Sequence, residues 1–160
     1  MLKKPSISNC RKNSAFTLVE LLVVIAILSF VLVALLRLFV ACGVLVNMSQ
    51  CITAATIDAQ NKIEEIRNSD FDDITTNYVS SGTPGNTFNL TTLTGKGVIY
   101  IDSSNPDLLQ IDIVVCFQDR YGRIYGEDVD LDGALDGGED LDGDNRIDSL
   151  VTVSTLISEK

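Results

Sequence analysis

The 160-residue chain contains no histidine. Histidine is the usual base beside a nucleophilic serine or cysteine, and it is the commonest ligand of zinc and iron. The chain also lacks a nucleophile elbow and a phosphate-binding loop, because Gly95-Lys96 has no glycine five residues upstream and is followed by Gly97 in place of Ser or Thr. The sequence therefore predicts a protein that is not an enzyme.

Positive charge is scarce outside the N-terminus. The chain has 12 basic and 22 acidic residues, and four of the basic ones (Lys3, Lys4, Arg11 and Lys12) lie within residues 1–15. The rest of the chain keeps 8 basic residues against all 22 acidic ones, a net charge of −14. Such a body repels nucleic acid and anionic headgroups and attracts cations. We therefore predict no contact with nucleic acid.

Four cysteines are present, and none has metal-binding spacing. Cys10 lies in the basic N-terminal segment, and Cys42 lies in an apolar run. Cys51 and Cys116 are the only plausible disulfide pair, and the alternative is that both are small buried residues.

An apolar run extends from Phe16 to Val46. As a helix, residues 16–37 span about 30 Å, the hydrocarbon thickness of a bilayer. Arg37 would reach the far interface with its long side chain. The basic segment would stay in the cytoplasm, so the acidic part would face outward.

Three ordinary interpretations of this run compete. A secretory signal has an apolar core of about 7–15 residues, which is shorter than this one. A lipoprotein signal would end at "FVAC", with Cys42 as the lipidated residue, but the run is again too long. A plain single-span anchor fits the length and leaves the lone carboxylate, Glu20, without a role.

The stretch "KNSAFTLVELLVVIAIL" (residues 12–28) resembles the N-terminal signature of type IV prepilins and of the pseudopilins of type II secretion. The resemblance implies that a prepilin peptidase cleaves between Ala15 and Phe16 and that the new amine of Phe16 is methylated. Glu20 would pair with this amine on a neighbouring subunit during filament assembly. Ala15 departs from the family, which usually has glycine there. The helix also lacks proline, so no bend is predicted.

The same resemblance implies the surroundings of the protein. Its partners would be other pilin or pseudopilin subunits, the prepilin peptidase, an inner-membrane assembly platform and membrane lipid. The protein would be a single-pass inner-membrane protein with a cytoplasmic leader and an extracytoplasmic head, later incorporated into a periplasmic or cell-surface filament. The alternative is an uncleaved, membrane-anchored module that binds calcium and acts at the surface as a monomer.

Beyond the membrane run, apolar residues recur at helical spacing and predict an amphipathic helix. They are Ile52, Ala55, Ala59, Ile63 and Ile66, whereas Asp58, Lys62 and Glu65 lie largely off this stripe. The segment "AQNKIEEIRNSDFDDI" resembles the corresponding part of minor pilins. We predict a leader at 1–15, an assembly half of the helix at 16–46, an amphipathic half at 47–70 and a β-sheet head at 71–160 with an insertion at 126–149.

About four antiparallel strands are predicted in the head, after a loop at "NYVSSGTPGN". "TFNLTTLT" and "GVIYID" would be strands joined near Gly95-Lys96-Gly97. "LLQIDIVVCFQD" and "LVTVSTLI" alternate in polarity. In the former, Leu109, Ile111, Ile113, Val115 and Phe117 share one face, and Gln110, Asp112 and Gln118 would face water. The turn "DRYGR", which follows the first of these two strands, would use Gly122 at positive φ. The fold class is α+β and type IV pilin-like, with a long N-terminal helix packed on a small antiparallel sheet.

The insertion "GEDVDLDGALDGGEDLDGDNRIDS" (residues 126–149) repeats with a period of 12 residues. Its first unit, loop 1 (residues 128–139), matches the calcium loop of an EF-hand. The matching positions are Asp128, Asp130, Asp132, the Ala134 carbonyl, Asp136 and Glu139. Gly133 stands at the sharp turn, and Leu135 stands at the apolar eighth position.

The second unit, loop 2 (residues 140–148), is less complete. Its candidate ligands are Asp140, Asp142, Asp144, the Arg146 carbonyl and Asp148. Asn145 replaces the turn glycine, and Val151 replaces the final carboxylate, which an outside oxygen would have to supply. We predict that Ca²⁺ binds both loops in a structural role, as in dockerin-like and thrombospondin-like repeats, which these loops resemble. The alternative is a solvated acidic loop.

Overall fold

The computed structural model describes residues 17–159, and its internal contacts divide the chain into two compact units, before and after the Cys42–Gly43 bond. The long helix α1 (Leu18–Arg67) contributes to both units. Ala15 and Phe16, the predicted cleavage and methylation residues, lie outside the described residues.

In the first unit, every described residue of α1 is exposed. The most apolar 18-residue window of α1 has a mean hydropathy of 3.0 and no buried residue, so the helix is long and apolar enough to cross a membrane. The Thr17 hydroxyl accepts a hydrogen bond from the Glu20 N–H at 3.2 Å, which caps the start of the helix. Glu20 therefore stands in the first turn, where the helix dipole favours a carboxylate.

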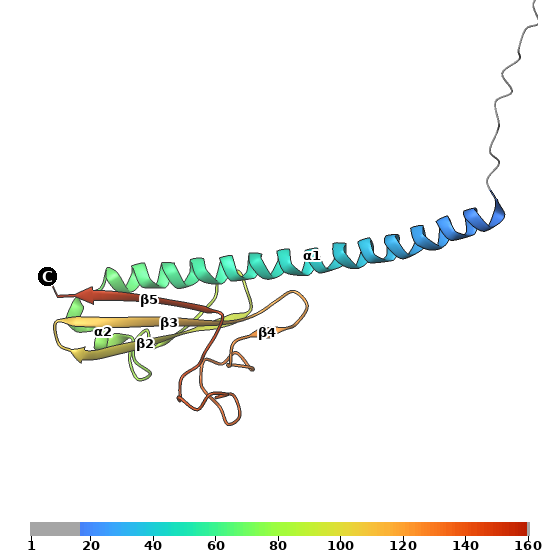
Figure 1. Ribbon diagram of the computed structural model, residues 1–160. Coiled ribbons are helices and arrows are strands. Elements are labelled where there is room, and N and C mark those ends of the chain that lie inside the picture. The colour runs from blue at the N-terminus through green and yellow to red at the C-terminus, as the bar shows by residue number, and fades with distance from the viewer. Residues whose placement is uncertain (1–16, 160) are drawn as a thin grey trace, which may run out of the picture. The chain divides into compact units, whose positions relative to one another are not determined.

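In the second unit, the C-terminal part of α1 lies along one face of an antiparallel sheet (Figure 1). The other elements are α2 (Phe71–Asn77), β1 (Thr87–Asn89), β2 (Gly95–Asn105), β3 (Leu108–Gln118), β4 (Ile124–Tyr125) and β5 (Val151–Ser158). The sheet order is β1-β2-β3-β4, and β5 pairs with β3 alongside β4. The predicted α+β fold with a long N-terminal helix is confirmed.

The core forms between the predicted helical stripe and the predicted face of β3. Ala55, Ala59, Ile63 and Ile66 are buried, and Ile52 packs at the margin. The five alternating apolar residues of β3 are all at most 2% exposed: Leu109, Ile111, Ile113, Val115 and Phe117. These two patterns predicted the core residues correctly, because burial on one side imposes a period of 3.6 residues on the helix and of 2 residues on the strand.

Asp58 corrects one detail of the helix prediction. It is only 6% exposed, although it was placed off the buried stripe. Its carboxylate accepts hydrogen bonds from the Thr91 N–H at 2.9 Å and the Thr91 hydroxyl at 2.6 Å. The contact joins α1 to the turn between β1 and β2, 33 residues away in sequence. A stripe analysis of the helix alone cannot anticipate a partner at that distance.

The first hairpin also differs from the prediction. β1 is only three residues long, and Gly95-Lys96-Gly97 starts β2 instead of forming the joint. Phe88 pairs with Gly97, and its ring occupies the space that a side chain at Gly97 would fill. Because Gly97 has no side chain, the Phe88 ring can pack directly against its backbone. The short helix α2 and the two-residue strand β4 were not predicted.

The acidic segment 126–149 covers part of the opposite face of the sheet. Val98, Val114, Cys116 and Ile147 form a second buried cluster there, with Leu131 and Leu135 packed against it. Gln110 is exposed as predicted, but Asp112 and Gln118 are half-buried, because the segment and the β4 turn lie over them. Cys51 and Cys116 are both buried, free thiols, and they belong to the two different clusters.

Candidate calcium loops and N-terminal motif

The backbone of the acidic segment repeats with the period of its sequence. Positive φ angles occur at Gly126 (121°), Leu131 (60°) and Gly133 (84°), and again 12 residues later at Gly138 (106°), Gly143 (84°) and Asn145 (61°). Asn145 adopts the left-handed geometry of the turn glycine that it replaces. Loops 1 and 2 therefore have the same local conformation, although one lacks a turn glycine.

The first aspartate of each loop accepts two backbone hydrogen bonds from the turn, and one of the two is equivalent in both loops. The Asp128 carboxylate accepts hydrogen bonds from the N–H groups of Asp132 at 3.1 Å and Gly133 at 2.9 Å. The Asp140 carboxylate accepts them from Gly143 at 2.6 Å and Asn145 at 3.2 Å. The bonds to Gly133 and Asn145 are equivalent under the 12-residue repeat.

The next two aspartates of each loop also form equivalent turns. Asp130 accepts from the N–H of Asp132 at 3.2 Å, and Asp132 accepts from Ala134 at 2.7 Å. The matching bonds in loop 2 join Asp142 to Asp144 N–H at 3.2 Å, and Asp144 to Arg146 N–H at 2.8 Å. Each turn points a carboxylate toward the inside of its loop.

The carboxylates of loop 1 converge. One oxygen from each of Asp128, Asp130 and Glu139 lies within 4.8 Å of the others, and the same holds for Asp130, Asp132 and Asp136. Two oxygens on opposite sides of a calcium ion, each about 2.4 Å away, are about 4.8 Å apart. Asp130 belongs to both groups, so all five predicted carboxylates of loop 1 gather around it.

Loop 2 gathers Asp140, Asp142 and Asp144 by the same criterion, and Asp148 lies outside this group. Burial and the charges of Asp142, Asp144 and Glu127 raise the pKa of Asp148. The carbonyl ligands predicted at Ala134 and Arg146 stay predictions.

Glu127 is the residue that sequence analysis missed. In loop 1, Glu139 accepts hydrogen bonds from Val129 N–H at 2.8 Å and Asp136 N–H at 3.0 Å. Glu127 accepts the equivalent bonds in loop 2, from Leu141 N–H at 3.2 Å and Asp148 N–H at 3.1 Å. Glu127 thus occupies in loop 2 the place of Glu139 in loop 1. The signal was present in the sequence, because "GED" occurs at both 126 and 138.

Without a bound cation, the close approach of the carboxylates in loop 1 is electrostatically unfavourable. The Asp128 side chain is fully buried. Burial raises the pKa of this carboxyl group, although the hydrogen bonds that it accepts from backbone N–H groups lower the pKa in part. The pKa of Glu139 is instead lowered by backbone hydrogen bonds from the Asp136 and Val129 segments. A divalent cation would offset the repulsion among these carboxylates, whereas a solvated loop would spread them apart.

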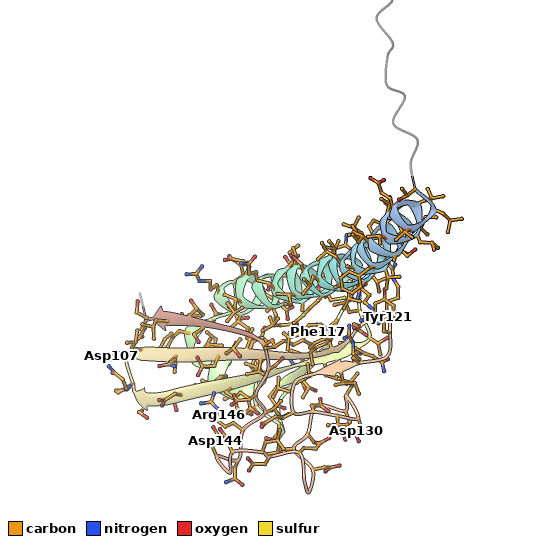
Figure 2. All side chains as sticks on the ribbon, turned by 45° about the vertical axis from the view of Figure 1, so that its right-hand side comes forward. Asp107, Phe117, Tyr121, Asp130, Asp144 and Arg146 are labelled. Carbon is orange, nitrogen blue, oxygen red and sulfur yellow. The ribbon has the colours of Figure 1, made fainter. Side chains whose placement is uncertain are left out.

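Loop 2 is fixed to the sheet by Arg146 and Ile147. The Arg146 guanidinium donates to Asp112 at 3.2 Å and stacks 4.4 Å from the centre of the Tyr100 ring. The Ile147 N–H donates to the Tyr100 hydroxyl at 2.8 Å. In Figure 2, Arg146 and Asp144 lie next to the sheet, and Asp130 lies on the neighbouring loop. The position of the loops is therefore coupled to β2 and β3.

At the other end of the chain, the N-terminal residues are similar to a known family. A family model described as the prokaryotic N-terminal methylation motif matches residues 10–36. The N-terminus therefore carries a prokaryotic N-terminal methylation motif, in agreement with the resemblance to prepilins. The match includes the Ala15–Phe16 junction, Glu20 and the first 19 residues of α1. No curated protein and no solved structure matches the chain.

Proposed function

We propose that this chain is a structural subunit of a type IV pilus-like or type II secretion pseudopilus filament. The observation that carries the proposal is the methylation motif at residues 10–36, which lies where the exposed apolar part of α1 begins. In this account, a prepilin peptidase cuts between Ala15 and Phe16 at the cytoplasmic face of the inner membrane. The new amine of Phe16 is then methylated, and the assembly platform incorporates the subunit into the filament.

Glu20 supplies the charge that the new amine needs. At about 4 Å and an effective dielectric constant near 20, such an ion pair gains about 4 kcal/mol before desolvation is subtracted. No ion pair of Glu20 occurs within residues 17–159. A pairing with the amine of a neighbouring subunit would set the register between adjacent apolar helices.

The exposed apolar surface of α1 needs a cover. Lipid can cover it in the membrane, and the helices of neighbouring subunits can cover it in a filament. The same apolar surface would therefore contact lipid before assembly and other subunits after it. Filaments sheared from cells test this account. They should contain the chain without residues 1–15, and recovery of the chain only from the membrane fraction would contradict it.

We propose that loops 1 and 2 bind calcium and that the bound ions stabilise the head. The donors are carboxylate oxygens, which hard cations prefer, and their spacing in loop 1 suits an ion with oxygen ligands about 2.4 Å away. Loop 1 would be completed by Glu139 and loop 2 by Glu127. Because the loops cover the second cluster of the sheet, the bound ions would hold β5 in place beside β3.

Thermal unfolding of the full chain in detergent micelles tests the calcium proposal. A ligand present at 100 times its Kd stabilises the folded state by about 2.7 kcal/mol per site. Extracellular sites bind calcium at about 10⁻⁴ to 10⁻³ M, so a rise in melting temperature is expected at about 10 mM calcium. Magnesium, which requires a tighter octahedral shell, serves as the control. Equal melting temperatures with calcium and with chelator would refute this part of the proposal.

A further inference from the structure

The turn between β3 and β4 carries positive charge in an otherwise acidic head. Its sequence, "DRYGR" (residues 119–123), contains two arginines and one aspartate. The Asp119 carboxylate is buried, accepts hydrogen bonds from the N–H groups of Tyr121 at 2.8 Å and Arg123 at 2.9 Å, and pairs with the Arg123 guanidinium at 2.8 Å. Arg120 is exposed and forms no ion pair within the part of the chain that the structure describes. The charge of Arg120 is therefore available to a partner.

A pocket of about 420 Å³ lies between this turn and α1. Gln50 of α1, Thr94 of the turn between β1 and β2, and Arg120 are among its lining residues. Asn47 also lines it, is only 8% exposed, and has a side-chain nitrogen with no hydrogen-bond acceptor among the described residues. Asp119 is the only acidic residue among the described lining residues, and its carboxylate is already paired. The pocket therefore combines hydrogen-bond donors with an unpaired positive charge and offers no unpaired negative charge.

The two ends of the sheet differ in charge. Figure 2 shows Tyr121 at one end of the sheet, near α1, and Asp107 at the opposite end. The hairpin that contains Asp107 also brings Asp102 and Glu159 to that end, through the pairing of β2 with β3 and the hydrogen bond from the Glu159 N–H to the Asp107 carbonyl. The acidic segment 126–149 lies over the sheet face that α1 does not cover. Negative charge is thus concentrated away from the turn and its pocket.

The positive end of the sheet adjoins the residues of α1 that follow the apolar run. Asn47 lines the pocket and comes directly after Val46, the last residue of that run. A helix over residues 16–46 is about 46 Å long, close to the thickness of about 40–45 Å of a bilayer with its headgroups. In a membrane-inserted chain, Asn47 would therefore stand at the outer headgroup layer. Tyr121, which is 59% exposed, suits the same depth, because tyrosine is enriched at membrane interfaces.

We propose that the pocket and the β3–β4 turn dock on the phosphate headgroup of an anionic phospholipid before the subunit enters a filament. The inference rests on the membrane-inserted state in the proposed function. A phosphodiester is negatively charged and only accepts hydrogen bonds, so it complements Arg120 and the donors of the pocket. The contact would hold the head on the membrane surface with its acidic end away from anionic lipid. A second copy is a poorer occupant, because parallel copies in one membrane place their acidic ends at equal height, away from this turn.

A single fluorescent probe at the turn tests the contact. The chain has no tryptophan, so Tyr121→Trp supplies the only one. The full chain is placed in lipid nanodiscs, one chain per disc, made of phosphatidylglycerol or of phosphatidylcholine with the same spin-labelled headgroup quencher. Docking should quench the fluorescence more strongly in phosphatidylglycerol, and added salt should reduce the difference.

Variants in this background measure the charge at the turn. Arg120→Gln should lower the ratio of docked to undocked heads about fivefold, the contribution of one arginine near an anionic surface. Arg67→Gln is the matched control, because Arg67 is an exposed arginine in the last turn of α1 and does not line the pocket. It should change the ratio less than twofold.

A second pair of variants adds a negative charge without changing side-chain size. Gln50→Glu places a carboxylate at the pocket and should lower the docking ratio at least fivefold. Gln60→Glu adds the same charge at another exposed position of α1, outside the pocket, and should change the ratio less than twofold. Both glutamines are exposed, so the fold should tolerate both changes.

The outcomes separate this inference from the proposed function. Equal quenching in the two lipids, or quenching that ignores both Arg120→Gln and Gln50→Glu, in a chain that has entered the discs would overturn the lipid contact alone. A chain that does not enter the discs would contradict the membrane-inserted state and refute both. Quenching that requires two chains per disc would assign the turn to a second copy and refute the lipid contact.

Discussion

Two regions of this chain place carboxylates where isolated charges are unfavourable, and they do so in different ways. Glu20 is one carboxylate in an exposed apolar helix, whereas residues 128–148 hold eight aspartates and one glutamate. For Glu20, the proposed partner is the amine of another subunit. For the acidic segment, the proposed partners are ions, and the loops already orient the carboxylates toward one another. In this account, the first region would be a site between molecules and the second a site within one molecule.

The largest expected effect concerns Glu20. We expect Glu20→Ala to insert into the membrane normally and to be absent from filaments, because the mature amine loses its partner. Immunoblots of sheared filaments and membranes measure both. Glu20→Gln is the matched control, since it keeps a side chain suited to the capped first turn but removes the charge. Normal assembly of Glu20→Gln would show that the charge of this residue is not needed.

The next effect concerns the junction between the acidic segment and the sheet. A side chain at Gly126 would overlap the Cys116 sulfur and would also require φ near 121°. Gly126→Ala should therefore lower the free energy of unfolding by about 3 kcal/mol, the combined cost of overpacking and backbone strain.

Gly138 provides the control for that variant. It has a similar φ of 106° at the equivalent position of the repeat, and no atom lies within 4 Å of the position that a Cβ would take there. Gly138→Ala should cost only the backbone strain, about 1–2 kcal/mol. Equal losses for the two variants in denaturant unfolding would contradict the close packing of Gly126 on Cys116.

The third prediction concerns Glu139 and Glu127, the carboxylates proposed to complete loop 1 and loop 2. Glu139→Gln should weaken calcium binding in loop 1 about 10- to 100-fold, and Glu127→Gln should do the same in loop 2, because each removes a charged ligand worth about 1.5–3 kcal/mol. Isothermal titration of the full chain measures both. Glu159→Gln, beyond the last strand, is the charge-matched control. Undisturbed binding in Glu127→Gln would show that loop 2 is completed otherwise or not at all.

Arg146 has the smallest expected effect. Arg146→Ala removes the ion pair with Asp112 and the stacking on Tyr100, and should cost about 1 kcal/mol of unfolding free energy. Arg146→Lys keeps the charge but loses the planar contact, so it should recover only part of the loss. Full recovery in thermal unfolding would assign the whole effect to charge.

The sequence was sufficient to predict the structure where one physical rule governed many residues. The helical stripe and the alternation in β3 each follow from burial on one side, and the convergence of the acidic side chains in loops 1 and 2 follows from their two-residue spacing. The sequence was not sufficient where a single contact crossed the chain. Asp58 with Thr91, Phe88 on Gly97, and Glu127 in loop 2 depend on residues that only the folded chain brings together.

The central claim is that the chain matures as a prepilin, and mass spectrometry of its N-terminus in native membranes tests this most directly. The account predicts a mature chain that begins at N-methylated Phe16, so that Glu20 is its fifth residue. A chain that still carries residues 1–15 in membranes containing an active prepilin peptidase would contradict it. The helix would then be a simple anchor for a calcium-binding head.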